Sequence, residues 1–399
     1  MRILAVWDDV AESELIRMYL GVDNAEVVLT TDPDEFVRLT ETGGSWDAIL
    51  LTTSHPGHER AFEIFEHVQR VQPGVPTVAA CLPGDVYRLA TYLTSGLRSY
   101  LIRDSNGDFM FLMHAVIVGA VQQVEADRER LVAEKLRREI DSVRQLQESI
   151  IPREIACPRE YSIAARYESS QIRVIGGQPV TMAGGDYYDA FTLPDDTVIV
   201  LVGDASGHGM KACMSIMTMH TIIRMIRYDE FRDPAKFVEH VNGVLCGQQL
   251  VQNEGGFITL LYGILNPMSG EFRWASAGHP SPLLQDLSGG AFELLGSEES
   301  AGLPLGILSE AEYETQSAVL PPRSRLMLYT DGIIEAFPAG GDRHEEFGLS
   351  GVQRTLGACR ELGLESTLQQ LFDDSHAFTA GQGRHDDTSV VLLERGGQM

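Results

Sequence analysis

The sequence predicts two folded domains of different class, an α/β domain followed by an α+β domain, joined by a helix. Strand-like and helix-like segments alternate over the first 122 residues. A strongly charged helical pattern follows, and the remainder of the chain is rich in short strand-like runs. We therefore expect domains at 1–122 and 153–399 and a helical linker at 123–152.

The composition argues against several classes of function. The chain has 399 residues, of which 44% are hydrophobic, so both domains can bury a core. The formal net charge of −26 disfavours nucleic acid or an anionic membrane as a partner. Five scattered cysteines and the lack of a signal-peptide pattern favour a cytoplasmic protein without disulfides. The longest apolar run, 109–121, is too short to span a bilayer, and we expect it to form a buried helix.

The first domain is predicted to be a five-stranded parallel sheet made of βα units. The expected strands are 3–6, 26–30, 48–52, 77–81 and 99–102, and the expected helices are 11–21, 33–41, 58–71, 84–94 and 108–121. This pattern resembles the receiver domain of bacterial response regulators. Asp8 and Asp9 resemble the acidic pair that holds magnesium there, and Arg103 stands where receivers usually carry a lysine.

The likeness breaks down at the positions that carry receiver chemistry. The phosphate-accepting aspartate would fall at position 52, which is Thr52, and Cys81 replaces the usual hydroxyl residue. A threonine hydroxyl cannot form the acyl phosphate that a carboxylate forms. We therefore interpret the domain as a pseudo-receiver without a phospho-acceptor. The alternative is a dimerisation or docking module with no chemistry of its own.

The linker carries a seven-residue apolar repeat with charged residues of both signs between its members. Leu136, Val143 and Ile150 recur at this spacing, and Ile140 and Leu146 lie close to the complementary stripe. Such a pattern favours a short coiled coil and therefore a homodimer through the linker helix. The alternative is one amphipathic helix that packs on its own domain.

Four aspartates of the second domain stand at strand boundaries, each beside a glycine or another acid. They are Asp186, Asp204, Asp331 and Asp386. Asp204 ends an apolar run and opens the turn Gly-Asp-Ala-Ser-Gly-His-Gly at 203–209. Carboxylates from several strands can converge on one patch, and only Lys211 and Arg384 lie near any of them in sequence. A pair of divalent cations would neutralise such a patch.

The rest of the second domain predicts a two-sheet β core with helices on its faces. Strands are expected at 162–168, 178–183, 197–203, 257–265, 271–276, 281–285, 314–319 and 325–330, with a last strand at 389–393. Helices are expected at 209–227, 233–248, 349–358 and 365–377.

The order of the acidic motifs resembles the SpoIIE-type branch of the metal-dependent type 2C protein phosphatases. The motifs are Gly-Gly-Asp-Tyr-Tyr-Asp, Gly-Asp-Ala-Ser-Gly-His-Gly, Ala-Gly-His-Pro, Thr-Asp-Gly-Ile-Ile-Glu and Asp-Asp-Thr-Ser, and the likeness covers about residues 145–395. It implies an α-β-β-α sandwich with two Mn²⁺ or Mg²⁺ ions. The four aspartates would be metal ligands, Ala205 would add its backbone carbonyl, and Asp204, Asp331 and Asp386 would be the catalytic set.

The resemblance implies a serine/threonine phosphatase that acts on a phosphoprotein. The expected substrate is an anti-sigma-factor antagonist of the STAS type, and the pseudo-receiver would control the activity through the linker. The alternative is a non-catalytic adaptor like the RssB-like response regulators, which join a receiver to a degenerate phosphatase-like domain. An adaptor need not keep four acidic ligands, so the sequence favours the enzyme.

Other polar residues near the motifs are less informative. Ser206 does not lie in a G-x-S-x-G elbow, so it is not expected to be a nucleophile. His208, His279 and His385 are candidates for a proton donor, although we interpret each as structural. Asp387 is expected to support the ligands, and Tyr187 and Tyr188 are expected to pack rather than to contact substrate.

Overall fold

The structure is a computed structural model that divides into two compact units, Met1–Glu134 and Lys135–Met399. It describes residues 1–397 except 22–23, 153–154, 159, 170–171, 176–177, 182, 208, 227–231, 249–255, 297–299, 339–344 and 380–385. The predicted domain boundaries at 122/123 and 152/153 stay predictions. The first of them lies inside one continuous helix.

The first unit is built on a five-stranded parallel sheet. Its strands are β1 (Arg2–Val6), β2 (Glu26–Thr30), β3 (Ala48–Thr52), β4 (Thr77–Cys81) and β5 (Ser99–Ile102). They lie in the order β2-β1-β3-β4-β5, which is the flavodoxin-like order of doubly wound domains. β3 and β4 are buried along their whole length, as their continuous apolar sequences predict.

Helices cover both faces of this sheet. They are α1 (Val10–Leu20), α2 (Pro33–Thr42), α3 (His58–Val71), the 3₁₀ helix η2 (Pro83–Arg88), α4 (Leu89–Thr94) and the start of α5 (Phe109–Ile150). Asp9 and Asp32 cap α1 and α2 by accepting hydrogen bonds from backbone N–H groups, which fixes where these helices begin. Two separate apolar clusters result, one on each face of the sheet.

The receiver-like positions of the first unit are occupied by an internal ion pair. The Arg103 guanidinium is 8% exposed and donates to Asp8 at 2.8 and 3.0 Å and to Glu12 at 2.8 Å. It also lies 4.5 Å from the centre of the Trp7 ring. Asp8 is therefore neutralised by the chain itself, and Asp9, the second member of the expected acidic pair, serves as a helix cap.

The helical patterns expected at 108–121 and in the linker form one continuous helix. α5 runs without a break through 42 residues. Its first part packs Phe109, Met113 and Ile117 into the core of the first unit. Among the described residues, α5 alone contains an 18-residue window apolar enough to cross a membrane by length and composition, and a third of that window is buried. A core helix meets the same criterion, and the packing of Phe109 to Ile117 is that of a core helix.

The second unit contains two five-stranded sheets. One has the order β15-β12-β11-β10-β9, and the other has the order β14-β13-β16-β17-β6. The strands are β6 (Tyr161–Glu168), β9 (Asp186–Thr192), β10 (Val198–Ala205), β11 (Ile258–Asn266), β12 (Glu271–Ala277), β13 (Leu283–Asp286), β14 (Phe292–Leu294), β15 (Gln316–Val319), β16 (Ser324–Tyr329) and β17 (Thr388–Arg395). A separate hairpin pairs β7 (Ile172–Ile175) with β8 (Gln178–Thr181).

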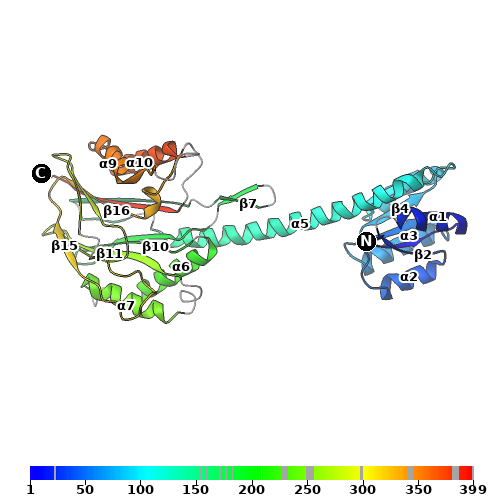
Figure 1. Cartoon of the computed structure of the whole chain (residues 1–399), viewed down its shortest axis with the longest axis horizontal. Helices are drawn as coiled ribbons and strands as arrows, with labels where there is room; N and C mark the ends of the chain where they lie inside the picture. The colour runs from blue at the N-terminus through cyan, green and yellow to red at the C-terminus, as the bar shows by residue number, and fades with distance from the viewer. Residues whose placement is uncertain are drawn as a thin grey trace. The chain divides into compact units, whose positions relative to one another are not determined.

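The two sheets form the middle of a four-layer sandwich. Figure 1 shows α6 (Met210–Met225) and α7 (Pro234–Cys246) outside one sheet and α9 (Gly348–Ala358) and α10 (Leu364–Phe378) outside the other. One apolar cluster lies between the sheets, and each helix pair covers a further cluster. The α-β-β-α architecture predicted for the second domain is therefore present. The strands expected from the sequence did not include β7, β9 and β14, which have four, seven and three residues.

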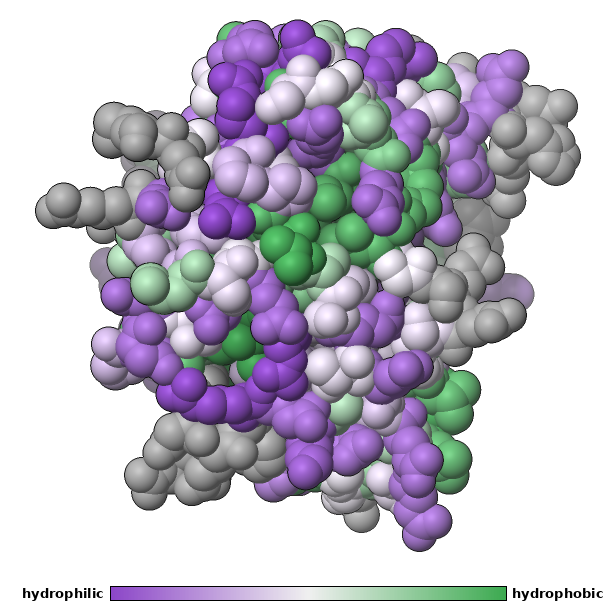
Figure 2. Space-filling model, turned by 90° about the vertical axis from the view of Figure 1, so that its left-hand side faces the viewer, coloured by the Kyte–Doolittle hydropathy of each residue, from purple (hydrophilic) through white to green (hydrophobic). Residues whose placement is uncertain are grey.

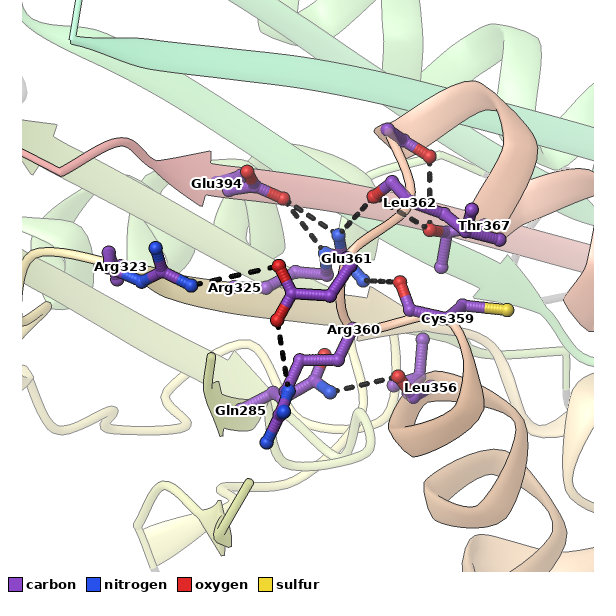
Figure 3. A network of polar contacts seen from close by, with 11 residues as sticks. Gln285, Arg323, Arg325, Leu356, Cys359, Arg360, Glu361, Leu362, Thr367 and Glu394 are labelled. Atoms are coloured by element: carbon purple, nitrogen blue, oxygen red, sulfur yellow. Dashed lines mark hydrogen bonds and ion pairs between the residues drawn. The ribbon is translucent and has the colours of Figure 1, made fainter. Parts of the chain in front are cut away.

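A buried arginine joins the second sheet to the α9–α10 turn. Arg325 on β16 is 1% exposed and donates to Glu394 on β17 at 2.8 Å. It also donates to the Leu362 carbonyl at 2.9 Å and the Cys359 carbonyl at 3.4 Å (Figure 3). Its charge is thus compensated within the fold, on the opposite end of β16 from Asp331.

The surface of the second unit is of mixed polarity. Figure 2 shows hydrophilic side chains over much of the face turned to the viewer, with an apolar patch among them. Large exposed apolar side chains in this unit include Met268, Leu294 and Val319, which lie on a turn and on the edge strands β14 and β15.

Candidate metal centre

Two of the predicted ligands lie directly opposite each other on neighbouring strands. Asp186 begins β9, and Asp204 lies near the end of β10. The antiparallel register of β9 and β10 pairs these two residues. Side chains of such a pair point to the same face of the sheet, so the register brings the two carboxylates together.

Residues from the second sheet complete the cluster. Thr330, which follows β16, donates its hydroxyl hydrogen to the Asp186 carboxylate at 2.6 Å. Asp331 comes next and opens the short 3₁₀ helix η4 (Asp331–Ile333). Asp386 and Asp387 precede β17, which pairs with β16, so the same end of the second sheet supplies all of these groups.

Glycine at positions 184 and 185 is required by the close approach of these groups. A Cβ atom on Gly185 would lie 2.8 Å from the Ala205 carbonyl oxygen and 3.2 Å from a carboxylate oxygen of Asp204. A Cβ atom on Gly184 would lie 2.3 Å from an Asp387 carboxylate oxygen. The Gly185 N–H donates to that Asp387 oxygen at 2.6 Å, so Asp387 holds the loop in place.

The cluster is electrostatically unfavourable as the chain presents it. Burial raises the pKa of the Asp204 carboxyl to about 10, and the negative charges of the other three predicted ligands act in the same direction. Burial, followed by the charge of Asp387, also raises the pKa of Asp186. In the part of the chain that the structure describes, no cationic side chain forms an ion pair with Asp186, Asp204 or Asp331.

The donor chemistry of the cluster suits a hard divalent cation. Carboxylate oxygens and the Ala205 carbonyl oxygen are the ligand types that Mg²⁺ and Mn²⁺ prefer. Among the described residues, however, no three histidine, cysteine, aspartate or glutamate side chains are arranged so that they could already hold a metal ion. The residues therefore fit the cations by donor chemistry and charge.

A residue of the linker helix supports the loop before Asp186. Gln147 is 1% exposed and donates its amide hydrogens to the carbonyls of Gly184 at 3.1 Å and Asp186 at 3.2 Å. Its side-chain oxygen accepts a hydrogen bond from the Gly184 N–H at 2.9 Å. The C-terminal turns of α5 are thus bonded to the backbone on both sides of Gly185. No local pattern indicated this role, because the bonded residues lie 37 and 39 positions apart in the chain.

Of the three candidate proton donors, only His279 lies among the residues that the structure describes. His279 is buried, burial lowers its pKa to about 3, and its Nδ1 lies 2.9 Å from the Thr259 hydroxyl. A neutral, buried imidazole agrees with the structural interpretation. His208 and His385 lie outside the described residues. The Ser206 hydroxyl oxygen accepts a hydrogen bond from the Phe257 N–H at 2.9 Å, so it stabilises the backbone before β11.

The other members of the Gly-Gly-Asp-Tyr-Tyr-Asp motif have structural roles. Asp189 is 1% exposed and pairs with Arg224 at 2.6 Å. The Tyr187 hydroxyl donates to Asp189 at 3.1 Å, and both Tyr187 and Tyr188 are buried in apolar clusters. The motif therefore places one aspartate in the acidic cluster and compensates the other internally.

Comparisons with known proteins agree with the motifs. The sequence model of the family described as stage II sporulation protein E (SpoIIE) matches residues 194–396. The chain is 23% identical over 326 residues to protein IcfG of Synechocystis, which covers 76% of this chain and 48% of IcfG. It is 26% identical over 295 residues to the phosphoserine phosphatase RsbU of Bacillus subtilis, which covers 71% of this chain and 78% of RsbU. The chain thus spans about half the length of IcfG.

A solved structure supports the architecture of the second unit. The SiaA-PP2C domain of Pseudomonas aeruginosa is 17% identical, with a TM-score of 0.52, over 65% of this chain and 97% of that domain. At this identity the likeness concerns the fold alone. Together with the parallel sheet of the first unit, it confirms the predicted fold class: a receiver-like α/β domain, a long helix and a type 2C phosphatase sandwich.

Proposed function

This chain belongs to the SpoIIE family, and from that premise we propose that it is a metal-dependent phosphatase for phosphoserine or phosphothreonine in proteins. The observation that carries the proposal is the cross-strand pair of Asp186 and Asp204, to which Asp331 and Asp386 are electrostatically coupled. Phosphoserine phosphatase activity is also what the name of the relative RsbU states for that protein.

The four aspartates and the Ala205 carbonyl would hold two Mn²⁺ or Mg²⁺ ions. Such a pair, when bound, supplies an activated water and neutralises charge on the phosphoryl oxygens. The chain's own part is to orient the ligands. Thr330 fixes one oxygen of Asp186, the Asp387 carboxylate fixes the Gly185 N–H, and β10 presents Asp204 beside the Ala205 carbonyl.

The proposal is tested by phosphate release from the phosphoserine form of a STAS-type anti-sigma-factor antagonist, with and without Mn²⁺. Asp204→Asn should lower the rate at least about a thousandfold, because metal ligands supply several kcal/mol of transition-state stabilisation. Asp195→Asn is the matched control, since Asp195 lies in the turn between β9 and β10 and pairs with Arg232. An inert wild-type protein would contradict the activity and favour the adaptor. Hydrolysis of phosphoserine peptides but not of the STAS protein would overturn the substrate class alone.

We further propose that the first unit controls the site through α5. Gln147 on α5 is hydrogen-bonded to the backbone of the loop that carries Asp186, so a rotation or shift of α5 would alter the positions of the metal ligands. This control would place the protein in a cytoplasmic partner-switching circuit, as the family resemblance implies, without nucleic acid or membrane as a partner.

The same helix would form a homodimer. Of the predicted seam, Leu136 and Leu146 are 47% and 51% exposed and Val143 is partly exposed, and Val132 at 63% continues this stripe at heptad spacing. Two other predicted members are not available to a partner helix in this way, because Ile140 is 4% exposed and Ile150 packs against the core of the second unit. Leu136→Glu should convert dimer to monomer in sedimentation experiments. Leu131→Glu, one position off the stripe and more exposed at 66%, should not. A monomeric wild type, or equal behaviour of both variants, would disprove the seam.

A further inference from the structure

Tyr167 lies beside the aspartate cluster, although β6 supplies none of the predicted metal ligands. In the antiparallel register of β6 and β17, Tyr167 pairs with Ser389, the second residue of β17. β17 directly follows Asp386 and Asp387, so the end of β6 lies next to the last acidic motif. The Tyr167 ring packs against the apolar cluster between the two sheets.

The Tyr167 hydroxyl faces the Asp387 carboxylate across Gly184. A Cβ atom on Gly184 would lie 2.2 Å from the Tyr167 hydroxyl oxygen and 2.3 Å from an Asp387 carboxylate oxygen. The two oxygens therefore share the space that a side chain at position 184 would fill. Burial, followed by the negative charges of Asp387 and Asp186, raises the pKa of Tyr167, which agrees with this proximity.

The hydroxyl of Tyr167 is a buried polar group that needs a partner. Its oxygen is shielded from solvent, and among the described residues no hydrogen bond is formed with it. Buried hydroxyls are nearly always paired. Two side chains lie near it, those of Asp387 and Ser169. The carboxylate is the stronger acceptor, because hydrogen bonds to ionised groups are about twice as strong as those between neutral groups.

The Asp387 carboxylate in turn holds the loop that leads to Asp186. It is 1% exposed, so few hydrogen bonds from bulk water are available to it. The oxygen near Tyr167 is the same one that accepts the Gly185 N–H at 2.6 Å. A carboxylate oxygen can accept two hydrogen bonds, and a second donor on this oxygen would fix the direction of the whole group.

We propose that the Tyr167 hydroxyl is a positioning group of the candidate metal centre. It donates its hydrogen to the Asp387 oxygen that also accepts the Gly185 N–H. The two donors together keep this carboxylate on the loop, so that Asp186 is presented to the ions and Asp387 does not compete for them. The inference rests on the proposed function, because it requires the aspartates to hold divalent ions.

The test is Mn²⁺ titration of the full-length protein by calorimetry. Tyr167→Phe keeps the ring and removes the hydroxyl, and it should weaken Mn²⁺ binding about tenfold, within the range seen for groups that orient ligands. Tyr161→Phe is the matched control. Tyr161 lies on the same strand and in the same apolar cluster, but its hydroxyl donates to the Pro267 carbonyl at 3.4 Å. It should leave Mn²⁺ binding unchanged, and unchanged binding in Tyr167→Phe would overturn the proposal.

A double-mutant cycle separates action through Asp387 from a merely structural role. Residues that act through one another show non-additive effects. Asp387→Asn should itself weaken Mn²⁺ binding, and adding Tyr167→Phe to it should change the affinity less than about twofold. If the two losses instead multiply, the hydroxyl acts independently of Asp387, and the proposal is wrong.

The number of bound ions separates a positioning group from a ligand. At saturating metal, Tyr167→Phe should bind as many Mn²⁺ ions as the wild type, whereas Asp204→Asn should lose at least one. Loss of an ion in Tyr167→Phe would contradict the positioning role. A wild type that binds no Mn²⁺ would refute the proposed function and this role together. A wild type that binds Mn²⁺, with Tyr167→Phe unchanged, would refute the role of Tyr167 alone.

Discussion

The two units place carboxylates at the ends of sheet strands in two contrasting ways. In the first unit, Asp8 and Glu12 share the buried Arg103 guanidinium, so the chain supplies its own cation. In the second unit, Asp186 and Asp204 face each other, and burial together with the charges of neighbouring carboxylates raises their pKa values. The first arrangement is complete without a ligand, and the second gains most from divalent cations. Aspartate at the end of a strand is therefore compensated by an arginine of the chain in the first unit, whereas in the second unit it lies among other carboxylates.

The largest change in stability is expected when the internal cation of the first unit is removed. Arg103→Met should lower the free energy of unfolding by about 2–3 kcal/mol, because it leaves two partly buried carboxylates unpaired. Urea unfolding followed by circular dichroism measures the change. Arg98→Met is the matched control, since Arg98 pairs with Asp127 on the surface, and it should cost less than about 1 kcal/mol. Equal costs for the two variants would remove the contrast between the units.

The next largest effect concerns the support of the open site by the linker helix. Gln147→Leu removes three hydrogen bonds to the loop around Gly185 and should weaken Mn²⁺ binding about 10–100-fold, the range seen for groups that orient ligands. The measurement is Mn²⁺ titration by calorimetry. Gln145→Leu, at an exposed position on the same helix, should bind Mn²⁺ normally. Unchanged affinity in Gln147→Leu would show that α5 does not act on the site.

A smaller effect is expected from the hydroxyl that orients Asp186. Thr330→Val should weaken Mn²⁺ binding about tenfold while the fold is kept, because valine preserves the shape of the side chain. Thr367→Val removes an equally buried hydroxyl that bonds to the Gly363 carbonyl in α10, so it serves as the control. If both variants bind Mn²⁺ like the wild type, the Thr330 bond is only structural.

The smallest expected effect is a gain in stability, whereas removing Arg103 from the first unit should cause a loss. In the metal-free protein near neutral pH, Asp204→Asn should raise the free energy of unfolding by about 1 kcal/mol, because the raised pKa makes the Asp204 carboxyl take up a proton on folding, which the neutral amide does not need to do. Thermal unfolding in the presence of a chelator measures it. Asp189→Asn should instead destabilise the protein, because Asp189 pairs with Arg224. A destabilising Asp204→Asn would mean that the carboxylate already has a favourable partner.

Local patterns predicted the fold well, and long-range contacts limited the prediction of the sites. Runs such as 48–52 and 77–81 are continuous and apolar, and they form strands with those bounds. β14 has only three residues, so it carries too little pattern to be recognised. The two hairpin strands β9 and β10 bring Asp186 and Asp204 together through simple antiparallel register.

Roles set by distant residues could not be derived in this way. From its sequence position, Asp8 resembled a magnesium ligand of receiver domains. In the structure, Arg103, which lies 95 residues away in the chain, neutralises the Asp8 carboxylate. Gln147 lies in a helical pattern and Thr330 in the motif of Asp331, so neither position points to Asp186, and only the fold brings the two residues to it. Burial within the tertiary structure, rather than residue type, decides which polar side chains support the site.

The central claim is that the aspartates of the second unit gather to hold divalent cations. Its most direct test is the number of Mn²⁺ ions bound per chain, measured by electron paramagnetic resonance on the wild type and on Asp204→Asn. We predict two ions for the wild type and a loss of at least one in the variant. A wild type that binds none, or a variant that binds as many as the wild type, would contradict the claim.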